Sequence, residues 1–147
     1  MRNALTATAH RLVYDDDLLY AYHPEDDDGP SYLGSLLIVT KRHAPTLADL
    51  TDAEARAIGL LVARLGRALK ACVDAERIYT HCFAETVPHV HMYVIARYSH
   101  TPKEFLRWRV FDWPDAPRGE TSAVAALCAQ LRECLAEAGN GIDTPVP

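Results

Sequence analysis

The sequence predicts an α+β fold with a mainly antiparallel, roughly five-stranded sheet, one long helix packed on the sheet and a C-terminal helix. Two observations carry this prediction. Short apolar segments with strand-like composition are grouped around one long amphipathic segment, and strands and helices do not alternate regularly as they do in parallel α/β proteins. The chain has 147 residues, a usual length for one domain, so we expect a single domain over residues 1–147.

Four segments are expected to form strands: Leu18–Tyr22, Leu33–Thr40, Ile78–Phe83 and Val90–Ala96. The first two flank the acidic cluster Glu25–Asp28 and the chain-breaking pair Gly29-Pro30, which favours a hairpin. The last two are separated only by a short turn around residues 84–88, and such a short connection favours an antiparallel pair.

Two helices are expected. Thr51 and Glu54 have the spacing of a capping box, in which each side chain satisfies a free backbone N–H group of the other residue. Apolar residues then recur at three- and four-residue steps from Ile58 to Cys72, which predicts a helix with one apolar face. A last helix is expected over about Ser122–Ala138, after an irregular segment, 99–119, that is rich in proline and aromatic residues.

The composition excludes several functional classes. The formal net charge of −5 argues against broad binding to duplex nucleic acid, which requires many basic residues on the phosphates. The four cysteines contain no C-x-x-C pair, so a disulfide-dense secreted domain is not expected. The sequence shows neither a secretory signal core nor an apolar run near 20 residues, and we therefore expect a cytoplasmic protein with reduced thiols and no membrane segment.

Residues 85–97, ETVPHVHMYVIAR, carry the clearest chemical signal. Side chains alternate between the faces of a strand, so His89, His91 and Tyr93 are expected on one face, in steps of roughly 7 Å. A neutral imidazole is a good nucleophile near neutral pH when its other ring nitrogen is held by a hydrogen-bond acceptor. This row of side chains therefore predicts a site for one extended ligand.

The run His89-Val90-His91-Met92-Tyr93 resembles the H-φ-H-φ-H-φ-φ signature of the histidine-triad (HIT) family of nucleotide hydrolases and transferases. The resemblance extends to the upstream segment GSLLIVTKRH at 34–43, which is similar to the family's G-H-x-L-φ-φ-P-K-R-H. The resemblance also includes the start of the helix after Leu50 and the segment AETVPH at 84–89, which leads into the histidine signature. It covers roughly residues 12–98 and implies a HIT-like fold.

The resemblance implies a role for each matching residue. His91 corresponds to the histidine that attacks the α-phosphate and becomes nucleotidylated, oriented by the backbone carbonyl of its own strand, here that of His89. The His89 side chain belongs to the polar network around this nucleophile, and Thr86 corresponds to a hydroxyl residue that contacts phosphate. The walls of the base and ribose pocket correspond to Tyr20, Leu36 and Ile38. The resemblance also implies a homodimer and a covalent step that needs no metal or other cofactor.

Three positions depart from the family pattern. Tyr93 replaces the third histidine, Ser35 replaces the histidine of the upstream G-H pair, and Glu85 replaces a glutamine. Tyr93 can donate a hydrogen bond without the charge of an imidazolium, and Ser35 can lend a hydroxyl. Glu85 repels a phosphate unless it is protonated, turned away or paired, for instance with Arg97. These departures point to a changed substrate or a lost activity.

Three other interpretations of the histidine pair stay open. The two histidines can be surface residues without a function. They can form a zinc site together with Tyr93, Cys82, His81 or an acidic residue. Because His81 and Cys82 alternate between the strand faces, only one of them can face a given cleft. Alternatively, the chain can be a nucleotide sensor without catalysis.

Two further groups have alternative interpretations. Residues 41–43, Lys-Arg-His, form either an anion-binding rim or a solvated turn, and we favour the turn. Trp108 and Trp113 either stack on a base or make packing or dimer contacts, and we favour the contacts.

Overall fold

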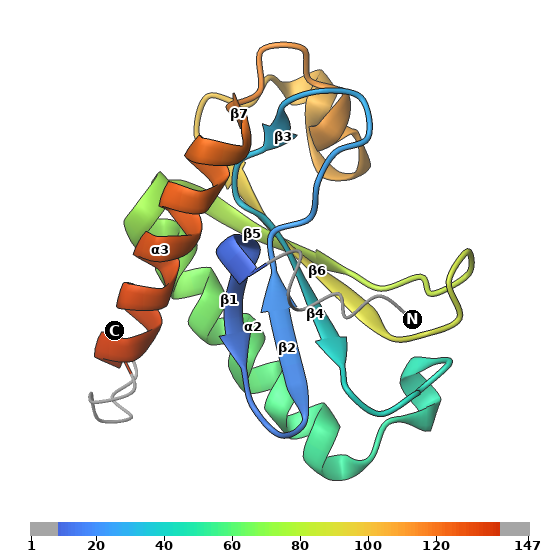
Figure 1. The fold of residues 1–147 in the computed structure, drawn as a ribbon. Helices are drawn as coiled ribbons and strands as arrows, with labels where there is room; N and C mark the ends of the chain where they lie inside the picture. Colours follow the sequence, from blue (N-terminus) through green and yellow to red (C-terminus); the bar gives the residue numbers. More distant parts are fainter. Residues whose placement is uncertain (1–8, 139–147) are drawn as a thin grey trace.

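The computed structural model describes residues 9–138, and a five-stranded antiparallel sheet in the order β1-β2-β4-β6-β5 lies at its centre (Figure 1). The strands are β1 (Leu12–Asp15), β2 (Leu19–Tyr22), β4 (Ser35–Thr40), β5 (Ala75–His81) and β6 (His91–Tyr98). The pairing of β2 with β4 and of β5 with β6 confirms both expected antiparallel pairs. The predicted fold class is therefore confirmed.

Three short strands were not predicted. β1 forms one edge of the sheet, and β3 (Ser31–Tyr32) pairs with β7 (Arg118–Gly119) in a separate ribbon. Strands of two to four residues are too short to produce a readable alternation of polar and apolar side chains. Four 3₁₀ helices complete the described elements: η1 (Ala9–Arg11), η2 (Leu47–Asp49), η3 (Lys103–Phe105) and η4 (Arg107–Asp112).

The long helix α2 (Asp52–Val73) begins at the predicted capping box. The hydroxyl of Thr51 accepts a hydrogen bond from the Glu54 backbone, and the Glu54 carboxylate accepts one from the Thr51 N–H at 2.8 Å. The same carboxylate is 2.7 Å from Arg42, whose hydrogen bond, together with those from Thr51, lowers the pKa of Glu54 to about 2. The helix start is thereby fixed to the segment that follows β4.

The main core lies between α2 and one face of the sheet. Leu65 and Leu69 of α2 are fully buried there against the side chains of Leu36, Ile38 and Val94. The helix α3 (Thr121–Ala138) packs beside α2 and against β1 (Figure 1). Within residues 9–138, no helix is both long and apolar enough to cross a membrane.

The segment that follows β6 covers one end of the opposite sheet face. Its Val110 and Trp113 pack with Tyr32 and Ile95 in a second apolar cluster. The Tyr32 hydroxyl donates a hydrogen bond to the carbonyl of Ala96 at 2.7 Å, which ties this cluster to the interior strand β6. The remainder of the face stays open, and the candidate site lies there.

Candidate active site

We call the sheet face opposite α2 the site face. Paired residues of antiparallel strands share a face, so the register of the strands defines rows of neighbouring side chains across it. The rows are Tyr20–Val39–His91, Tyr22–Leu37–Tyr93–His81, and Ser35–Ile95–Tyr79. The sheet therefore places His91 and Tyr93 on one surface, as expected, together with Tyr20 from β2 and His81 from β5.

His91 is the first residue of β6, and its ring is held in one orientation. Its Nδ1 lies 2.7 Å from the backbone carbonyl oxygen of His89. A carbonyl oxygen can only accept a hydrogen bond, so Nδ1 carries the proton and Nε2 of the neutral ring keeps its lone pair. This is the contact that the resemblance implied, and a ring held in this way has the chemistry of a nucleophile at Nε2.

The side chain of His89 lies elsewhere than expected. His89 precedes β6, and its Nε2 donates to the backbone carbonyl of Thr40 at 2.7 Å, at the end of β4. Its Nδ1 is then free to accept a hydrogen bond from Nδ1 of His43, 3.3 Å away, and the two rings are stacked. The expectation of a strand row shared by His89 and His91 is therefore wrong, because the chain bends before β6 begins. His89 acts on His91 through its backbone.

Tyr93 and His81 are cross-strand partners whose rings are stacked, with centroids 4.6 Å apart. Burial raises the pKa of Tyr93, so its hydroxyl keeps its proton at neutral pH and can donate a hydrogen bond. Burial also lowers the pKa of His81, and the neighbouring His91 lowers it further. The site therefore contains a second imidazole, His81, close enough to His91 for its pKa to be affected.

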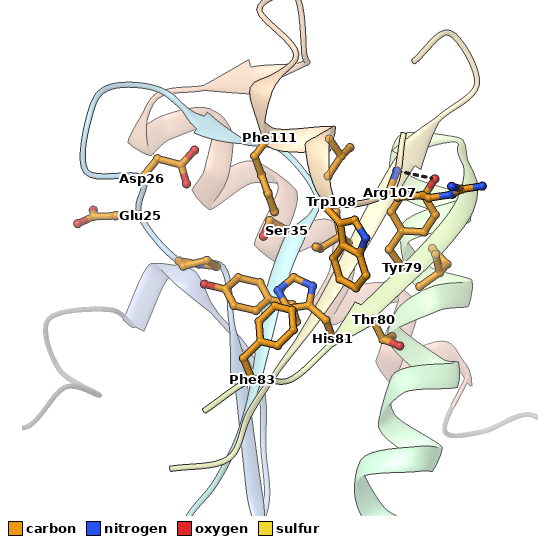
Figure 2. Close-up of a pocket in the computed structure, with 15 residues that line it drawn as sticks. Glu25, Asp26, Ser35, Tyr79, Thr80, His81, Phe83, Arg107, Trp108 and Phe111 are labelled. Atoms are coloured by element: carbon orange, nitrogen blue, oxygen red, sulfur yellow. Dashed lines mark hydrogen bonds between the residues drawn. The ribbon is translucent and has the colours of Figure 1, made fainter. Parts of the chain in front are cut away.

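A cavity of about 880 Å³ opens over the third row and over Tyr93 and His81 of the second row (Figure 2). His91, in the neighbouring first row, does not line it. This volume is within the usual range for small-molecule pockets. Most of the lining is apolar or aromatic. The lining includes Tyr79, His81, Phe83, Tyr93, Ile95, Trp108, Val110 and Phe111. Glu25 and Asp26 lie on one side and Arg107 on the other, so the pocket combines planar surfaces with a few polar groups.

The expected binding residues occupy different environments. Ser35 lines the pocket and is only 2% exposed. Leu36 and Ile38 do not reach it, and this expectation is corrected: both are fully buried in the main core, on the α2 face of β4. Thr86 and Glu85 are exposed in the loop between β5 and β6.

The basic residues considered as partners of Glu85 or of a bound anion have other partners. Arg97 pairs with Glu76 at 2.9 Å, so the suggested pairing of Arg97 with Glu85 is not formed. Lys41 pairs with Asp15 at 2.6 Å, and the guanidinium of Arg42 bonds to Glu54, as described above. These contacts favour a structural turn at residues 41–43 over an anion-binding rim.

Two acidic residues of the turns and the two tryptophans also have defined positions. Asp26 pairs with Arg118 at 2.9 Å, and Asp16 accepts hydrogen bonds from backbone N–H groups of its own turn. Over residues 9–138, no three His, Cys, Asp or Glu side chains are grouped so that they could hold a metal ion. Trp113 is buried in the second cluster, as the packing interpretation predicts, whereas Trp108 is 73% exposed and lines the pocket.

Sequence reasoning missed one histidine that supports the pocket. His23 is fully buried directly after β2; its Nδ1 donates to the carbonyl of Pro24, and its Nε2 accepts from the N–H of Gly34 at 3.3 Å. Burial lowers the pKa of His23, so the ring stays neutral and can accept this bond. A single histidine in a turn gives no periodic signal, so only the structure reveals that it fixes the turn before Ser35.

The fold and the site define a class of α+β proteins in which a histidine of a central strand presents a ring nitrogen on an open sheet face. Comparison with known families identifies the class, because the model of the HIT domain matches residues 6–100. The chain belongs to the histidine-triad (HIT) family. No curated protein matches the sequence.

Solved structures of histidine-triad proteins share the fold. A histidine triad protein from Bradyrhizobium japonicum has a TM-score of 0.65 at 20% identity, over 92% of this chain and 96% of that one. A hypothetical histidine triad nucleotide-binding protein from Sulfolobus tokodaii has a TM-score of 0.65 at 18% identity, over 86% and 84%. The diadenosine triphosphate hydrolase of Plasmodium falciparum has a TM-score of 0.62 at 16% identity, over 87% and 78%.

Proposed function

We propose that the chain is a nucleotide hydrolase or nucleotidyl transferase that forms a covalent nucleotidyl group on Nε2 of His91. One observation carries this proposal: the hydrogen bond from Nδ1 of His91 to the His89 carbonyl leaves the Nε2 lone pair free on an open face. The attack forms a phosphorus–Nε2 bond, and the bond from phosphorus to the leaving group breaks. Water or another acceptor then attacks the phosphorus and returns the electron pair to Nε2.

The nucleotide class follows from the pocket beside His91. Its aromatic side chains offer planar surfaces for a base, and the cavity has room for a nucleoside. Two of the compared structures are described as a nucleotide-binding protein and a diadenosine triphosphate hydrolase, which supports the same class. We place the base in the inner part of the pocket, near Ser35 and Phe111, with the phosphate next to His91.

Negative charge develops on the phosphoryl oxygens during the attack, and hydrogen-bond donors aimed at these oxygens lower the barrier. Tyr93 is next to His91 on the site face, with ring centroids 6.3 Å apart, and its neutral hydroxyl can donate. The exposed hydroxyl of Thr86, in the loop before β6, is a second candidate donor. In the same loop Glu85 is exposed, so its carboxylate can stay hydrated and away from the phosphate.

A panel of substrates tests this proposal. The protein is incubated with nucleoside 5′-phosphoramidates and dinucleoside polyphosphates carrying different bases, with and without a chelator, and the release of nucleoside monophosphate is measured. We expect turnover of at least one class, unchanged by the chelator. Saturable nucleotide binding without turnover of any compound would contradict the proposal and identify a binding module instead.

A further inference from the structure

His81 has no counterpart in the histidine signature. It lies next to Tyr93, which occupies the position of the missing third histidine. It is the last residue of β5, and the register places it directly opposite Tyr93. It shares the site face with His91, which is its diagonal neighbour on β6. Diagonal neighbours on one face of an antiparallel pair are about 7–8 Å apart, which is close enough for their side chains to reach one small group between them.

The surroundings of His81 hold its ring at the edge of the pocket. The ring lies nearly parallel to Tyr93, with an interplanar angle of 21°, and its centroid is 5.0 Å from that of Phe83. Figure 2 shows His81 together with Phe83 and Trp108, on the opposite side of the pocket from Glu25 and Asp26. The ring faces are thus packed against aromatic neighbours, while the side chain lines the cavity.

We infer that His81 donates the proton that the leaving group needs, an inference that rests on the proposed function. Tyr93 in the third signature position can donate a hydrogen bond, but a phenol is a poor proton donor near neutral pH. The register of β5 supplies an imidazole next to the same position instead. An amine leaving group cannot depart as an anion, so a substrate with a phosphorus–nitrogen bond requires such a donor.

His81 gives up a proton in the first step of the reaction and regains one in the second. In the first, Nε2 of His91 attacks the phosphorus, the bond to the leaving nitrogen breaks, and protonated His81 gives its proton to that nitrogen. In the second, neutral His81 takes a proton from the attacking water, the phosphorus–Nε2 bond breaks, and its electron pair returns to Nε2. The products are a nucleoside monophosphate and a free amine, and both histidines are regenerated.

The charges around His81 fit this role. His91 and Tyr93 face it from β6, Arg107 lines the same pocket from η4, and Cys82 follows it in the chain. Burial and the nearby His91 both lower the pKa of His81, which makes the protonated ring a stronger acid, and the negative charge of a bound phosphate favours that protonated ring. Because Nδ1 of His91 already donates to a carbonyl, His91 itself has no proton to offer while it attacks.

The test compares two leaving groups. His81→Gln and His81→Phe keep a planar side chain next to Tyr93 but cannot transfer a proton. For each variant, the rate of nucleotidyl-His91 formation is measured with an amine leaving group and with nitrophenolate, which departs without a proton. We expect the rate to fall by about 10²–10⁴-fold for the amine and by less than about tenfold for nitrophenolate. Arg77→Gln, on the same strand but outside the pocket, controls for changes in β5.

Two results overturn the inference. Equal losses for both leaving groups would assign His81 to substrate positioning, and unchanged rates for both would remove it from the reaction. A wild-type protein that forms no adduct with either substrate would instead refute the proposed function, and the inference with it. Circular dichroism identifies a variant that fails to fold, and the second variant then provides the comparison.

Discussion

Replacement of His91 with alanine is expected to abolish the nucleotidyl adduct and to lower turnover by about 10⁴-fold or more. The variant keeps the pocket and the neighbouring Tyr93, but it removes the only nitrogen that the His89 carbonyl orients for attack. The adduct is measured by quenching a reaction with labelled phosphoramidate in base, because a phosphorus–nitrogen bond is labile in acid. Intact-protein mass spectrometry provides a second readout.

Alanine variants of two other histidines, His89 and His100, serve as controls for the His91 variant. His89→Ala keeps the backbone carbonyl that holds Nδ1 of His91, and it removes only the side-chain bonds to Thr40 and His43. We therefore expect an intermediate loss of turnover with the adduct retained. His100→Ala alters a histidine that packs on Trp113 and does not line the pocket, and it should leave the adduct unchanged. Adduct formation by the His91 variant at the wild-type rate would exclude this residue as the nucleophile.

Replacement of Gly34 with alanine is expected to lower the free energy of unfolding by about 2–4 kcal/mol. Gly34 has a φ of +92°, a conformation that strains any residue with a Cβ atom. An added Cβ would also lie 2.9 Å from the Cβ of Ala96, inside the packed core. Since the N–H of Gly34 bonds to His23 and its carbonyl accepts from Ala96, the backbone cannot easily move away. Urea unfolding of the purified variant measures the loss.

Gly29 offers a matched control for this substitution. Its φ of +124° also favours glycine, but an added Cβ would meet no atom within 4 Å. Gly29→Ala therefore carries the backbone strain without the collision, and we expect a loss of about 1 kcal/mol. Similar losses for the two variants would show that the contact with Ala96 is accommodated, contrary to the expectation that β6 packs tightly against the residue before β4.

Much of the fold can be predicted from local signals, because those signals have local causes. The helix start at Thr51 follows from one pair of side chains, and the antiparallel pairing of β5 with β6 follows from a short connection. It is harder to predict from the sequence which residues of β4 face the site. All six residues of β4 are buried, so polar and apolar positions do not alternate. The sequence therefore does not reveal that Leu36 and Ile38 face α2 while Leu37 and Val39 face the site.

The site itself depends on contacts that no single segment contains. The orientation of His91 could be anticipated because its acceptor lies two residues away in the chain. The position of the His89 ring could not, because it depends on Thr40 and His43 after a different strand. The place of His81 likewise follows only from the register of β5 against β6.

The most direct test of this account is to determine which ring nitrogen carries the hydrogen in the neutral tautomer of His91 in the free protein. Nitrogen-15 correlation spectra of labelled protein at neutral pH, assigned with His91→Ala, report which ring nitrogen carries the hydrogen. The bond to the His89 carbonyl predicts hydrogen on Nδ1 and an unprotonated Nε2. Hydrogen on Nε2 with a bare Nδ1 would contradict the account, because the nitrogen assigned to the attack would then have no lone pair to offer.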